Sequence, residues 1–92
     1  MQIKFYASFR SVAGTHSLEL NLPAGTTARE LVEELLERFP ALRSHLIHES
    51  GAIRQHVHAF INGEDISTLE QGWDTPLQPT DKLDFIPPVG GG

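Results

Sequence analysis

Residues 23–40 hold the longest helical pattern in the chain, and this pattern limits the folds that the chain can adopt. Thr27 followed by Glu30 predicts a capping box at the start of the helix, and Pro40 ends it. The residues expected to form one buried stripe are Ala28, Leu31, Val32, Leu35, Leu36 and Phe39. The chain has 92 residues, a length typical of a single domain, so we expect one core built against this helix.

Two segments before the helix alternate between apolar and polar residues, which is typical of half-buried strands. In residues 1–8, Ile3, Phe5 and Ala7 share one face. In residues 16–23, Leu18, Leu20 and Leu22 do the same. The short connection around Gly14 predicts that the two strands form a hairpin.

Two further strands are expected after the helix. Residues 57–61 read as a strand that turns at Asn62-Gly63 into a short partner at residues 64–66. Residues 82–86 form the last strand, with Leu83 and Phe85 facing the core, and the prolines that follow end the pairing. Residues 41–56 are expected to contain a short second helix that ends before Gly51.

The order strand, strand, helix, strand, strand predicts an α+β fold of two layers. The first and last strands would lie side by side in the middle of a mixed sheet, with the helix across one face. This arrangement is the β-grasp, or ubiquitin-like, fold. We expect residues 1–88 to form this domain and residues 89–92 to form a flexible tail of glycines.

Charge and composition exclude several classes of function. The net charge is −5 and no stretch is basic, which argues against nucleic acid and acidic membranes as partners. The chain has no cysteine, and therefore no thiol nucleophile or disulfide of its own. It also lacks a long apolar run or a signal-peptide pattern, so we expect a cytoplasmic protein.

The sequence from residue 85 onward reads "FIPPVGGG". Glycine has the greatest backbone freedom to lose on folding and has no side chain to pack. Such a tail is either a disordered end without a role or the functional part of the molecule.

The tail and the loop before the last strand resemble the MoaD/ThiS family of sulfur carrier proteins. The Pro87-Pro88-Val89-Gly90-Gly91-Gly92 end resembles the family's Pro-Pro-Val-x-Gly-Gly, and Asp74-Thr75-Pro76-Leu77 and Asn62-Gly63 match family motifs. One departure is Pro79-Thr80-Asp81, where the family usually has Asp-Gly-Asp. The middle of the chain is closer to the CysO-type carriers of cysteine biosynthesis, whereas the end is closer to the molybdopterin synthase small subunit.

The resemblance implies a carrier and co-substrate, not an enzyme. A ubiquitin-activating-type adenylating enzyme would use ATP to adenylate the Gly92 carboxylate, and persulfide sulfur would then displace AMP and leave a thiocarboxylate. No bound cofactor is implied. A synthase subunit that accepts the sulfur would be the second partner, and Pro88, Val89, Gly90 and Gly91 would thread the tail into these enzymes.

Strand alternation also indicates a candidate docking surface. If the residues named above face the helix, Tyr6, Phe60 and Ile86 face away from it, and large apolar groups on an open face often mark a binding site.

Two alternatives to the carrier remain open. One is a ubiquitin-like modifier, which would need the same tail, with Gly92 joined to a target lysine. The other is an interaction module with an inert tail.

The spacing of His45 with His48, and of His56 with His58 on one strand face, could bring metal ligands together, but a zinc site needs at least three ligands. We expect no metal site.

Overall fold

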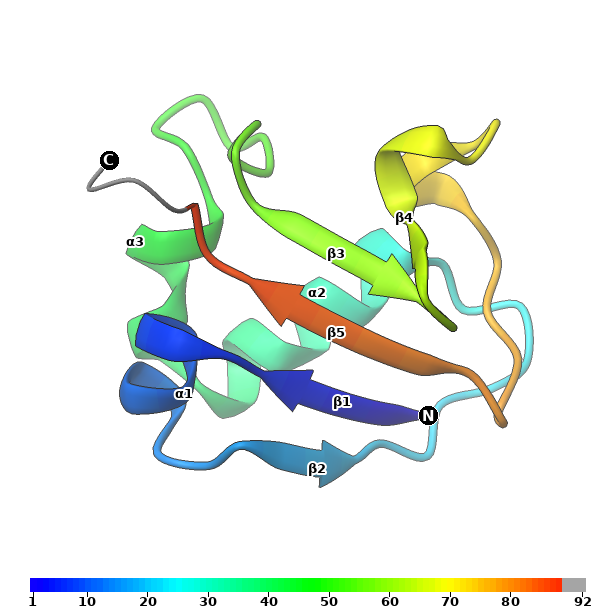
Figure 1. Cartoon of the computed structure of the whole chain (residues 1–92), viewed down its shortest axis with the longest axis horizontal. Helices are drawn as coiled ribbons and strands as arrows, with labels where there is room; N and C mark the ends of the chain where they lie inside the picture. The colour runs from blue at the N-terminus through cyan, green and yellow to red at the C-terminus, as the bar shows by residue number, and fades with distance from the viewer. Residues whose placement is uncertain (89–92) are drawn as a thin grey trace.

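The computed structural model describes residues 1–88. Its centre is a five-stranded sheet in the order β2-β1-β5-β3-β4. The strands are β1 (Gln2–Phe5), β2 (Ser17–Glu19), β3 (His58–Ile61), β4 (Glu64–Asp65) and β5 (Lys82–Ile86). β1 and β5 are parallel, and the other pairs are antiparallel. The predicted β-grasp arrangement, with the first and last strands adjacent at the centre, is confirmed (Figure 1).

The helix α2 (Ala28–Arg38) crosses one face of the sheet (Figure 1). Its predicted capping box is present: the Glu30 backbone N–H donates to Thr27 Oγ1 at 3.1 Å, and the Thr27 N–H donates to Glu30 Oε1 at 3.0 Å. The cap satisfies backbone donors that the first turn leaves without a helical acceptor. The predicted stripe faces the sheet, with its last member, Phe39, half-buried.

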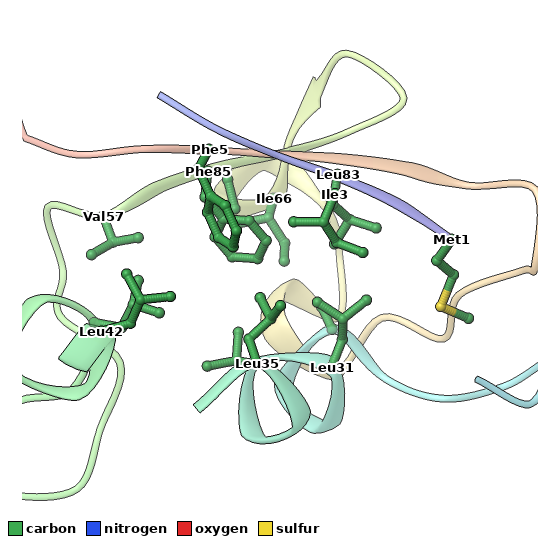
Figure 2. Close-up of a cluster of buried hydrophobic side chains, with 14 of the residues drawn as sticks. Met1, Ile3, Phe5, Leu31, Leu35, Leu42, Val57, Ile66, Leu83 and Phe85 are labelled. Atoms are coloured by element: carbon green, nitrogen blue, oxygen red, sulfur yellow. The ribbon is translucent and has the colours of Figure 1, made fainter. Parts of the chain in front are cut away.

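The core lies between α2 and the sheet. Leu31 and Leu35 of the helix face Ile3, Leu83 and Phe85 of the central strands (Figure 2). All five side chains are fully buried. The alternation in β1, β3 and β5 therefore places every second side chain against the helix, as the sequence predicted.

The connection between β1 and β2 is not the simple turn that the sequence predicted. It contains the helix α1 (Ala7–Ala13), which places Phe9 in the core. Ala7 does not continue the inward face of β1. β1 ends at Phe5, and Ala7 is the exposed first residue of α1, with a φ of 51°. β2 is also shorter than predicted, since it ends at Glu19 and leaves Leu22 half-buried outside it.

Short elements complete the domain. The 3₁₀ turn η1 (Pro40–Leu42) leads into α3 (Arg43–Leu46), the predicted short second helix. At the predicted Asn62-Gly63 turn both residues have positive φ, 51° and 86°. Two further 3₁₀ turns follow β4: η2 (Ile66–Thr68) and η3 (Gly72–Asp74). Trp73 of η3 stacks on Phe85, with 6.4 Å between the ring centroids, and so covers part of the core.

None of the helices within residues 1–88 combines the length and the hydrophobicity needed to cross a membrane.

Candidate partner-binding face and tail exit

The chain leaves the sheet from its central strand. β5 pairs with β1 on one side and with β3 on the other, so both edges of the strand are hydrogen-bonded. Pro87 is buried and Pro88 is exposed directly after it. The fixed φ of proline makes this exit stiff. The other predicted tail residues, Val89, Gly90, Gly91 and Gly92, lie outside the described residues.

The strand registers bring Tyr6, Phe60 and Ile86 to the face of the sheet opposite α2. Ile86 pairs with His58 in β3, and the Tyr6 N–H donates to Phe85 O at 3.2 Å, which aligns Tyr6 beside Ile86. Phe60 pairs with Asp84, so it lies one step along the same face. Tyr6 is 41% exposed, whereas Phe60 and Ile86 are half-buried. We call these three residues the apolar patch.

Charged groups lie among the members of the apolar patch. Asp84 pairs with Lys4 on one side and with Phe60 on the other, and the Tyr6 hydroxyl donates to Asp84 Oδ1 at 3.5 Å. On the outer strand Asp65 pairs with Phe60. Hydrogen bonds from the Ser67 backbone N–H and hydroxyl favour the ionised form of Asp65 and lower its pKa below the usual value. This face of the sheet therefore combines apolar side chains with the carboxylates of Asp84 and Asp65 and the ammonium group of Lys4.

The structure does not place His56 and His58 on one strand face, as the sequence suggested. β3 begins at His58, so His56 precedes the strand and does not share a strand face with it. His48 instead accepts a hydrogen bond at Nδ1 from the Ser50 backbone N–H, at 3.1 Å. Within residues 1–88 no group of three or more histidine or acidic side chains is placed to hold a metal ion.

Sequence reasoning missed a second surface beside the tail exit. The loop that follows α3 lies next to Pro88 and forms a groove with it, lined in part by His48, Ile53, Arg54 and His56. The signal in the sequence was the concentration of four of the five histidines within residues 43–58. The spacing of these histidines pointed to metal ligation and gave no indication of a groove.

Comparison with known proteins decides the family. A profile of the ThiS family matches residues 3–92. The chain belongs to the ThiS family. Small archaeal modifier protein 3 of Haloferax volcanii is 30% identical over the whole chain and 98% of that protein. The molybdopterin synthase sulfur carrier subunit of Arabidopsis thaliana is 27% identical over the whole chain and 82% of that protein.

A solved structure of a related protein gives the same fold. The solution structure of small archaeal modifier protein 1 from Methanosarcina acetivorans superposes with a TM-score of 0.87 at 29% identity, over 99% of this chain and 94% of that one. These likenesses agree with the predicted ubiquitin-like fold. The relatives with which this ThiS-family chain aligns are small modifier proteins and a sulfur carrier subunit.

Proposed function

We propose that this ThiS-family chain is a sulfur carrier whose Gly92 carboxylate is converted to a thiocarboxylate. The observation that carries the proposal is the extent of the family match, which runs through Gly92 and so includes the whole Pro-Pro-Val-Gly-Gly-Gly end. The thiocarboxylate donates its sulfur in a biosynthetic reaction, either in the assembly of molybdopterin or in cysteine biosynthesis of the CysO type.

The proposed chemistry takes place on the backbone. The carboxylate of Gly92 attacks the α-phosphorus of ATP in the adenylating enzyme and releases pyrophosphate. A persulfide sulfur of the sulfur-donating enzyme then attacks the acyl carbon and displaces AMP. Reduction of the resulting acyl disulfide by a thiol leaves the thiocarboxylate. Within this chain only the terminal carboxyl group reacts, which is consistent with the absence of cysteine.

The described part of the chain suits a protein that presents a terminus to a narrow site. The last strand is held on both edges, and buried Pro87 fixes the direction in which the chain leaves. A fixed exit limits the number of residues that must be ordered when a partner takes up the tail. Glycine has no Cβ, so Gly90 and Gly91 allow a partner's pocket to close around the backbone.

The apolar patch is our proposed docking surface for the adenylating enzyme. Ile86 is the last residue of β5 and stands two residues before Pro88, so an enzyme that contacts the patch lies near the exit of the tail. The half-buried Phe60 and the exposed Tyr6 are the type of aromatic residue that often carries the energy of an interface.

Reconstitution tests the carrier proposal. The protein is incubated with an adenylating enzyme from the same organism, ATP and a persulfide donor, and its intact mass is measured. Replacement of one oxygen by sulfur adds about 16 Da to a carboxylate. A sample without ATP is the control, and a mass gain that maps within residues 1–88 contradicts the proposal.

A second candidate function is protein modification, in which Gly92 is joined to a target lysine. The observation that favours it is the full-length similarity to a small archaeal modifier protein. Under this function, denaturing gels of cell extracts show heavier species that contain the chain and that resist reducing agents, because an isopeptide bond is not a thioester. If all heavier species are lost on reduction, modification is not the function.

A further inference from the structure

A groove of about 480 Å³ lies beside the point where the chain leaves the sheet. Its lining is mostly apolar, with Ile53 and Pro88 among the lining residues. Arg54, His48 and His56 supply polar groups to the same lining. The volume lies within the range in which proteins hold ligands or side chains of a partner.

The wall of this groove is held in place by the backbone. The His48 N–H donates to Ala52 O at 2.8 Å, and Ile47 and Ile53 form an antiparallel bridge. The Arg54 N–H donates to Leu46 O, also at 2.8 Å, which ties the loop to α3. A binding site that is already formed requires little ordering when a ligand enters.

The charge of the groove is opposite to that of the whole chain. Residues 43–58 contain two arginines, four histidines and only one of the twelve acidic residues, Glu49. Arg54 uses Nε to donate to Ser44 O at 3.1 Å, and within residues 1–88 it forms no ion pair. The Nδ1 of His48 is engaged by the Ser50 backbone N–H, so Nε2 is the ring nitrogen left without a hydrogen bond within residues 1–88.

We propose that this groove binds an acidic segment of a protein partner, with one apolar side chain inserted between the flanking carboxylates. The apolar lining beside Ile53 and Pro88 receives the side chain, and the guanidinium of Arg54 pairs with a carboxylate. The ring nitrogens of His48 and His56 donate to further acceptors of the segment, since a histidine ring carries at least one N–H. The surface is separate from the apolar patch, and Pro88 places its occupant next to the tail.

A peptide titration tests the proposal independently of the sulfur-carrier function. The probe is the acetylated and amidated peptide Asp-Glu-Leu-Phe-Glu-Asp, and the readout is the backbone amide shifts of the labelled full chain. We expect saturable shifts within residues 48–56. The matched control peptide, Asn-Gln-Leu-Phe-Gln-Asn, has no negative charge and should bind about fivefold or more weakly.

Two variants assign the binding to the groove. Arg54→Glu should weaken binding about tenfold, in line with the loss of an attractive charge contact and the gain of a repulsive one. His56→Glu leaves the hydrogen bond from Arg54 to Ser44 in place, and it provides the same test if Arg54→Glu fails to fold. The control is Lys82→Glu, the same charge reversal at the far end of β5, which should leave the affinity within about twofold.

Three results overturn the proposal. One is the absence of saturable shifts, and another is a set of shifts centred on the apolar patch. The third is a shift of residues 48–56 that depends on protein concentration without peptide, because it identifies a second copy of the chain as the occupant.

Discussion

Phe60 and Phe39 are both half-buried phenylalanines, but they lie on opposite faces of the sheet. Phe60 belongs to the apolar patch, whereas Phe39 packs edge-on against Phe5 of the core, with 5.9 Å between the ring centroids. Truncation of an interface anchor often costs about 2 kcal/mol of binding. We therefore predict that Phe60→Ala weakens binding to the adenylating enzyme at least about tenfold and lowers the melting temperature by only a few degrees.

Phe39→Ala is the matched control for this prediction. It should lower the free energy of unfolding by about 3 kcal/mol and leave the affinity of the folded protein nearly unchanged. Calorimetry measures both quantities for both variants. If Phe60→Ala folds well and binds normally, the partner does not contact the apolar patch.

Ala7 has the backbone conformation that the sequence could not predict. Its φ of 51° lies in the left-handed region, which is unfavourable for a residue with a Cβ such as alanine. We predict that Ala7→Gly leaves the free energy of unfolding unchanged or raises it by up to about 1 kcal/mol, because relief of strain offsets the extra entropy of the unfolded chain. Ala7→Val should lower it, since a β-branched residue tolerates positive φ less well. Urea unfolding of both variants measures the difference, and equal losses in the two would exclude this account.

At the scale of single elements, the cap of α2 gives a direct test of local stability. Thr27→Ala removes the acceptor for the Glu30 N–H and should lower the free energy of unfolding by about 1 kcal/mol. The control is Thr80→Ala, in a turn, whose side chain makes no hydrogen bond within residues 1–88. Thermal unfolding measures both changes. Equal melting temperatures for the two variants would show that the cap does not stabilise α2.

The elements differ in how far local sequence determines them. α2 was predictable because cap, apolar stripe and terminating proline agree over one continuous segment. α1 was not, because Ile3, Phe5 and Ala7 continue the alternation of a strand. The strand instead ends at Phe5, and the unusual φ of Ala7 starts the helix that brings Phe9 to the core. Tertiary packing of Phe9 therefore outweighs the local pattern.

At the scale of the whole molecule, the two surfaces of interest also differ in predictability. The apolar patch follows from alternation, since a residue next to a core position in a strand points to the other face. The groove depends on residues 48–56 lying beside Pro88, a contact between segments more than thirty residues apart in the chain. No periodic pattern encodes such a contact, and only the concentration of histidines indicated it.

We propose that the fold of residues 1–88 presents the Gly92 carboxylate to partner enzymes, and that within this chain this carboxylate alone carries the chemistry. The most direct test compares the full chain with a variant that lacks Gly91 and Gly92, in the same reaction with adenylating enzyme, ATP and persulfide donor. Our account predicts a mass gain of about 16 Da on the full chain, located at Gly92 by fragmentation. It predicts no gain on the truncated chain, and equal melting temperatures, since glycines contribute no side-chain packing. A truncated chain that still gains sulfur would contradict the account.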